Sequence, residues 1–129
     1  MSQGKSKTLE QKRAEHAWNV VSQVAETQDK KRIEEFALQS KKLTVRVLTS
    51  GLGPALAFLE AKDYARDLRK ALNDWIATQN WAKRQVATST TQASLIERII
   101  QGDSEFLRLA TDEVVSYMQW LVRFTEAKL

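Results

Sequence analysis

Apolar residues recur with a helical period along most of the chain, and capping residues mark where the helices begin. A first helix is expected to begin near Thr8, which has capping-box spacing to Gln11, and to end within residues 26–28. A second helix of about five turns is expected between Asp29 as N-cap and Gly51 as left-handed C-cap. The inward stripes are expected to be Ala14, Ala17, Trp18, Val21, Val24 and Ala25 on the first helix and Ile33, Phe36, Ala37, Leu43, Val47 and Leu48 on the second.

Two further helices are predicted in the middle of the chain. Pro54 suits the first turn of a short third helix, because its missing N–H would be unpaired there, and residues 55–61 form the body. A fourth helix over residues 63–78 gathers its apolar residues in one arc. That arc comprises Tyr64, Leu68, Ala71, Leu72 and Trp75. Residues 85–93 are rich in threonine and serine without an apolar period, which predicts a mobile surface loop.

Two helices complete the chain, so six are expected, four longer and two short. Ser94 has capping-box spacing to Glu97 and begins a short helix over residues 95–101, and Asp103 caps a final helix that nearly reaches the end of the chain. Apolar residues sweep roughly two thirds of the circumference of the final helix, against about a third to a half for an ordinary surface helix. This helix is therefore expected either to be central in the bundle or to expose a subunit-binding face.

Glu113 lies inside the apolar sector of that final helix. A buried carboxylate is costly unless it is paired, which predicts an arginine or lysine partner on a neighbouring helix. A lone carboxylate without a histidine or a second acid is a poor catalyst, so we do not expect an acid–base role.

The composition fits these helices. The 129 residues include one proline and four glycines, which leaves few places for β-turns. We predict an all-α fold in which residues 1–129 form a single compact helical bundle, with residues 1–7 disordered.

Several classes of chemistry can be set aside. The chain has no cysteine and one histidine, His16, which excludes a disulfide framework, a thiol nucleophile and a structural zinc site. No cofactor and no metal site are predicted. The N-terminus is polar and no apolar run approaches the roughly 20 residues of a membrane span, so we expect a soluble cytoplasmic protein with no membrane contact.

Charge is distributed unevenly. Residues 1–50 carry ten Lys or Arg against six Asp or Glu, a net charge of +4, whereas residues 103–129 carry three against five, a net charge of −2. A basic half and an acidic end suit head-to-tail association between copies, and the basic side also suits a phosphate partner. The candidate nucleic-acid-binding residues on outward helix faces are Lys42, Arg46, Arg66 and Lys70, with Lys31 and Arg69 nearby. Interrupting carboxylates leave open that these are ordinary solvated faces.

Two other surface features bear on partners. Leu38 and Val45 project outward beside the lysines of the second helix, which indicates a protein contact there. Trp81 with Lys83 and Arg84 could form a stacking platform for a single strand, although such a tryptophan more often fixes a loop to the core.

Two segments resemble the small helical subunit of the Cmr, or type III-B, CRISPR–Cas ribonucleoprotein. They are GLGPALAFLEAK over residues 51–62 and RLATDEVVSYMQWLVRFTEAKL over residues 108–129. The matching positions are Lys42, Leu43, Gly51, Leu52, Leu56, Ala57, Phe58, Leu59, Lys62, Phe106, Ala110, Thr111, Glu113, Trp120, Leu121, Arg123, Phe124, Glu126 and Ala127. The chain departs from the family pattern at Thr44, where a proline is usual, and at Thr49 and Ser50 before the glycine.

The resemblance implies a non-catalytic subunit of an RNA-guided antiviral complex. Such subunits stack head to tail as a minor filament beside the backbone subunits, reach the large polymerase-like subunit and line the groove that receives target RNA. The implied partners are therefore other Cmr effector subunits, copies of this chain and the guide RNA–target RNA duplex, whose backbone would be contacted without base preference. Lys42 is the cation favoured both by its surface placement and by the resemblance.

Two alternatives belong to other classes. A HEPN-type ribonuclease needs an arginine and a histidine more widely spaced than Arg13 and His16, which have two residues between them. His16 is also expected to lie opposite the apolar stripe of the first helix. The other alternative is a generic helical adaptor that binds a protein through the final helix.

Overall fold

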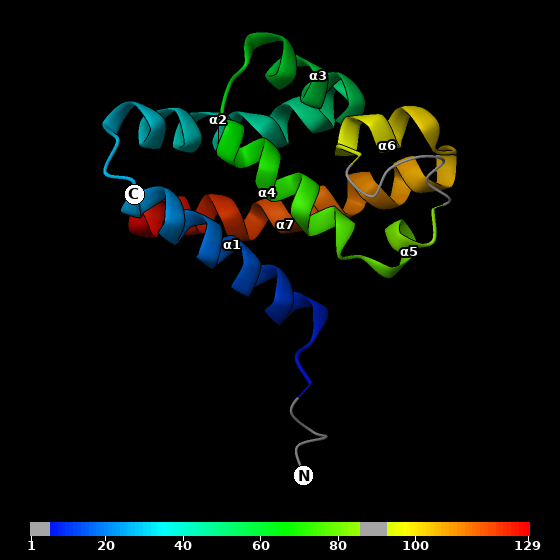
Figure 1. Ribbon diagram of the computed structural model, residues 1–129, viewed down its shortest axis with the longest axis horizontal. Helices are drawn as coiled ribbons and strands as arrows, with labels where there is room; N and C mark the ends of the chain where they lie inside the picture. Colours follow the sequence, from blue (N-terminus) through cyan, green and yellow to red (C-terminus); the bar gives the residue numbers. More distant parts are fainter. Residues whose placement is uncertain (1–5, 86–92) are drawn as a thin grey trace.

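The computed structural model describes residues 6–85 and 93–129, and these residues form seven α-helices without any strand (Figure 1). The predicted all-α fold is confirmed. The helices are α1 (Leu9–Glu26), α2 (Lys30–Ser50), α3 (Leu52–Lys62), α4 (Arg66–Ala77), α5 (Asn80–Lys83), α6 (Leu95–Gln101) and α7 (Ser104–Lys128). Most of the expected disordered N-terminus and nearly all of the expected mobile loop lie outside the described residues.

The predicted N-caps are confirmed by their hydrogen bonds. At the start of α1, the Gln11 N–H donates to Thr8 Oγ1 (3.1 Å) and the Gln11 side chain accepts from the Thr8 N–H (2.9 Å). Ser94 forms the equivalent capping box at α6. Single caps begin the two longest helices, since Asp29 accepts from Arg32 N–H (3.1 Å) and Asp103 from Phe106 N–H (2.9 Å). These side chains satisfy backbone donors that have no partner within their helix.

The boundaries around α3 differ from the prediction. The short helix begins at Leu52, so Pro54 is its third residue, and α4 begins at Arg66 instead of residue 63. Gly51 has the expected positive φ (95°), but its ψ of 159° lies outside the left-handed helical region, because this one residue ends α2 and also caps α3. Asp63 (φ 54°) and Ala65 (φ 49°) have left-handed backbone conformations, which interrupts the helix between α3 and α4. The four-residue α5 was not predicted, since so short a helix shows no period.

Helix α7 is the central helix of the bundle. It packs against α1, α2 and α4, and Figure 1 shows it running behind α4 between α1 and α2. Its inward side chains, including Tyr117, Met118 and Leu121, are fully buried against Val21 of α1 and Leu43 of α2. The apolar circumference of α7 is thus explained by neighbours on three sides.

Two residues of the predicted inward stripes lie on the surface instead. Leu48 is 70% exposed, because α7 and α3 cover the side of α2 that carries Val47 and leave the adjoining side open. Trp18 is 41% exposed at the edge of the α1–α7 contact, where its ring lies edge-on against Phe124 (centroids 5.0 Å apart). Both predictions were wrong because a helical period does not reveal how far a neighbouring helix reaches around the stripe.

Gly102, between α6 and α7, is expected to be intolerant of any side chain. A Cβ atom there would lie 2.9 Å from Arg98 O and 3.1 Å from Phe106 Cβ. Gly102→Ala should therefore lower the free energy of unfolding by about 1–3 kcal/mol through overpacking. Gly53→Ala is the matched control, because its Cβ would meet only Ile99 Cγ2 at 4.0 Å inside a helix. The control should raise stability by roughly 0.4–1 kcal/mol, and urea unfolding of both variants measures the contrast.

Candidate nucleic-acid interface

The two candidate cations on α2 are one turn apart and have different environments. Lys42 is exposed, and among residues 6–85 and 93–129 it forms no ion pair. Arg46 is half-buried, donates from Nη1 to Gln39 Oε1 (2.7 Å), and its guanidinium carbon lies 4.2 Å from the centroid of the Phe58 ring on α3. Lys42 is therefore available to a phosphate, whereas Arg46 also holds α2 against α3.

The two candidate cations of α4 are exposed but already paired. Arg66 Nη2 lies 3.0 Å from Asp63 Oδ2, and Lys70 Nζ lies 2.6 Å from Asp74 Oδ2. Hydrogen bonding to these carboxylates raises the pKa of both cations above their usual range. A phosphate would have to displace or share these partners, although exposed pairs of this kind are weak.

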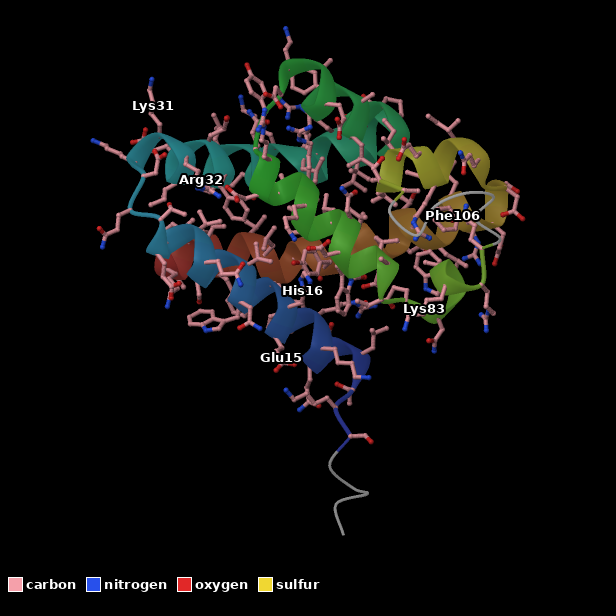
Figure 2. All side chains as sticks on the ribbon, in the orientation of Figure 1. Glu15, His16, Lys31, Arg32, Lys83 and Phe106 are labelled. Atoms are coloured by element: carbon pink, nitrogen blue, oxygen red, sulfur yellow. The ribbon has the colours of Figure 1, made fainter. Side chains whose placement is uncertain are left out.

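The α2 pair and the α4 pair point to different parts of the surface. Arg66 lines a depression of about 530 Å³ together with Lys31 and Arg32 from the start of α2. Figure 2 shows those two side chains at the end of α2 away from α6. Neither this depression nor the one that holds Lys70 includes Lys42 or Arg46. The four predicted residues thus do not share one pocket.

Lys41 is a cation that the sequence-based selection missed. It is exposed on α2 and, like Lys42, forms no ion pair within the described ranges. It also borders a groove of about 660 Å³ against α7, lined by Met118 and Val122 among others. The signal was available, since two consecutive lysines on the face opposite an apolar stripe are both expected to reach solvent.

The predicted partner of Glu113 is Arg13 of α1. Arg13 Nε and Nη2 donate to Glu113 Oε2 and Oε1 at 2.6 and 2.8 Å, and Trp75 Nε1 of α4 donates to Oε2 at 2.9 Å. The bidentate bond to Glu113 is the main reason that the pKa of Arg13 is raised. This buried network joins α1, α4 and α7. It also occupies the Arg13 guanidinium, which is therefore not free to act on a substrate.

His16 does not lie opposite the apolar stripe as predicted. Its ring is half-buried between α1 and α4, with Nδ1 2.7 Å from Tyr117 Oη and the ring centroid 5.3 Å from that of Trp75 (Figure 2). The position falls about 80° beyond Val24 around the helix, and α4 packs on that side of α1. Arg13 and His16 are therefore both engaged in packing and do not face a common cleft.

The burial of His16 gives the fold a pH dependence. Burial lowers the pKa of His16; Asp74 partly offsets this effect and the positive charge of Lys70 adds to it. In the unfolded chain the usual pKa of histidine is about 6.5. As pH falls through that value, the unfolded chain binds a proton that the folded chain does not, so stability is full above pH 6.5 and decreases below it. Urea unfolding from pH 7.5 to 5.5 should show this decrease. His16→Gln, in a chain with no other histidine, should flatten the profile, and an equal slope in the variant would contradict the assignment.

Trp81 fixes α5 to the core. Its ring packs edge-on against Phe106 of α7, with centroids 5.5 Å apart, and Figure 2 shows Phe106 on the part of α7 that lies above α5 and Lys83 in this view. Lys83 and Arg84 are exposed beside it. The packing favours the structural interpretation of Trp81 over a stacking platform.

The described residues contain no group of three or more His, Asp or Glu side chains that could hold a metal ion. No helix among them is long and apolar enough to cross a membrane.

Comparison with protein families gives one match that spans nearly the whole chain. The model of the family described as CRISPR-associated protein (Cas_Cmr5) matches residues 9–128. These are the first residue of α1 and the last residue of α7, so the match covers every helix described above.

Proposed function

This chain belongs to the Cas_Cmr5 family of CRISPR-associated proteins, and from that premise we propose that it is a non-catalytic subunit that lines the target-RNA groove of its complex. As a small subunit of a Cmr, type III-B, system it has other Cmr subunits as partners. In the proposal, copies of the chain stack head to tail beside the backbone subunits, in the cytoplasm. The family match over residues 9–128 is the observation that carries this proposal.

The positions that resemble the family pattern have structural roles in this chain. Glu113 accepts the buried bonds from Arg13 and Trp75, and Trp120 Nε1 donates to Glu10 Oε1 (3.1 Å) at the start of α1. Phe58 lies under the guanidinium of Arg46. These side chains determine how the helices pack. Packing roles of this kind support a structural subunit over an enzyme.

The RNA contact in this proposal begins with Lys42. An exposed cation with no carboxylate partner binds a backbone phosphate at the least cost. Arg46, Arg66 and Lys70 would contribute less, because each already bonds to another side chain. Contacts of this kind recognise charge and spacing without base preference, which suits a complex in which base pairing identifies the target.

The charge distribution supports stacking between copies. The chain is basic over residues 1–50 and acidic over residues 103–129. Because α7 packs against both α1 and α2, these segments form adjoining surfaces of one copy. A head-to-tail contact joins two different surfaces, so the acidic surface of one copy can meet the basic surface of the next, which favours it over a symmetric pair.

A generic helical adaptor remains the second candidate. It is favoured by the apolar side chains that α2 exposes, Leu38 and Val45 among them. The two candidates differ in one respect that can be measured, since an adaptor would enter no particle that contains guide RNA.

The absence of catalysis can be tested in the assembled particle. A particle that carries His16→Gln should cleave target RNA at the wild-type rate, because His16 bonds to Tyr117 and faces no cleft with Arg13. The isolated chain should not cleave the same RNA. A large loss of cleavage in an intact variant particle would favour the ribonuclease alternative.

A further inference from the structure

Helix α2 exposes a run of large apolar side chains on its outer face. Leu38 is 49% exposed, Val45 61% and Leu48 70%. At 100° and 1.5 Å per residue, the three lie within an arc of about 80° over roughly 15 Å of helix. The other large exposed apolar residues are spread over α1, α6, α7 and the C-terminus. We call Leu38, Val45 and Leu48 the α2 apolar stripe.

Two lysines accompany this stripe. Lys41 and Lys42 project from the same face between Leu38 and Val45, and neither forms an ion pair within residues 6–85 and 93–129. Most arginines of the molecule, by contrast, form ion pairs. Arg32, on the opposite side of α2, pairs with Asp67 of α4. Glu34, one turn before Leu38, is a carboxylate on the outer face. The centre of the stripe is therefore flanked by two lysines without an ion-pair partner among the described residues, although Glu34 lies at one end of it and Glu10 and Glu126 line the groove that Lys41 borders.

We propose that the α2 apolar stripe docks an amphipathic helix with carboxylates beside its apolar face, presented by a different subunit of the complex. This inference rests on the proposed function for its setting and adds the surface and the chemistry of the partner. The apolar side chains would be removed from water by the partner, while its carboxylates meet Lys41, which lies within the arc of the stripe. Lys42 lies about 40° outside that arc, beyond Leu38, and stays open to the RNA contact proposed above. The length of the stripe, roughly 15 Å, corresponds to about three helical turns of the partner.

The stripe suits a protein better than RNA. Bases stack on aromatic or guanidinium planes, and the outer face of α2 offers aliphatic side chains at these three positions. A phosphate backbone laid along the stripe over Lys41 would leave Leu38, Val45 and Leu48 without apolar contact, whereas RNA at Lys42 can pass beside the stripe. A helix with an apolar face satisfies both features at once, as helix-in-groove recognition does.

The test compares the wild-type particle with one in which Leu38, Val45 and Leu48 are all changed to serine. The three side chains are exposed, so the isolated variant should fold with the wild-type melting temperature. We expect its incorporation into the particle, measured by competition with the wild-type chain, to fall at least roughly tenfold, since removing 1.4 kcal/mol of contact energy changes a binding constant tenfold. Ile100→Ser, at a position 75% exposed on α6, is the matched control and should incorporate normally.

Crosslinking identifies the occupant. Because the chain has no cysteine, Val45→Cys can carry a single photoreactive label. Crosslinks to an apolar segment of another subunit that contains Asp or Glu would support the proposal, whereas crosslinks to RNA or to a second copy of this chain would overturn it.

The outcome also separates this inference from the proposed function. Equal incorporation of the triple variant and the wild type would remove the docking surface alone. Failure of the wild-type chain to enter any particle would remove the proposed function, and the docking surface with it.

Discussion

Glu113→Ala is expected to lower the free energy of unfolding by about 3–5 kcal/mol, because it removes the buried partner of Arg13. Arg13 would then keep only Glu10, an exposed carboxylate 3.1 Å from its Nη1. Glu113 is 6% exposed and accepts two bonds from Arg13 and one from Trp75. Without the carboxylate, the Arg13 guanidinium and the Trp75 indole N–H would lose acceptors in a site that water reaches poorly. The helices α1, α4 and α7 would lose the polar contact that they share.

Urea or thermal unfolding of the variant measures this effect, and the melting temperature should fall by roughly 10 °C or more for a domain of this size. Glu126→Ala is the matched control on the same helix, since its pair with Arg123 (3.6 Å) is exposed and should contribute less than about 1 kcal/mol. A Glu113→Ala protein within 1 kcal/mol of the wild type would show that the network does not hold the bundle together.

Charge reversal of the candidate interface is expected to give the largest functional effect. In an intact particle, Lys42, Arg46, Arg66 and Lys70 changed together to glutamate should weaken binding of target RNA by at least roughly tenfold at low salt, with a shallower salt dependence. Among single variants, Lys42→Glu should have the largest effect, because Lys42 is not neutralised within the chain. Arg66→Glu and Lys70→Glu should have smaller effects, since Asp63 and Asp74 already offset those charges.

Filter binding or fluorescence anisotropy with particles of verified composition measures these affinities. Arg108→Glu is the matched control, because Arg108 is an exposed arginine on α7 that is paired with Glu105, as Arg66 is paired with Asp63 on α4. Unchanged affinity of the fourfold variant at low salt would remove these residues from the RNA groove. Arg46→Lys separates the charge of Arg46 from its packing on Phe58, since it keeps the positive charge and loses the planar guanidinium that lies over the ring.

Local chemistry made much of the fold predictable. The caps at Thr8, Asp29, Ser94 and Asp103 depend on a side chain and a backbone donor three residues away, so the sequence contains both partners. The pairing of Glu113 followed from the cost of a buried charge, although the identity of Arg13 as partner did not. The predictions that were wrong concerned tertiary contacts. His16, for example, was expected on the outer side of α1, but α4 covers it.

The candidate interface was less predictable for the same reason. Outward placement on a helix follows from the period, and it holds for Lys42, Arg66 and Lys70. Whether a cation is free or engaged depends on neighbours in space. The pair of Lys70 with Asp74 could have been inferred from their four-residue spacing, whereas the position of Arg46 over Phe58 requires the fold of α3 against α2.

Native mass spectrometry tests most directly whether this chain is a subunit of a Cmr ribonucleoprotein. The tagged chain is co-expressed with the neighbouring effector genes and a guide RNA. We expect a stable particle that contains the guide RNA, other Cmr subunits and one or more copies of this chain. A chain that purifies alone, with neither partner subunits nor RNA, would contradict its role as a Cmr subunit and leave the helical adaptor as the better explanation.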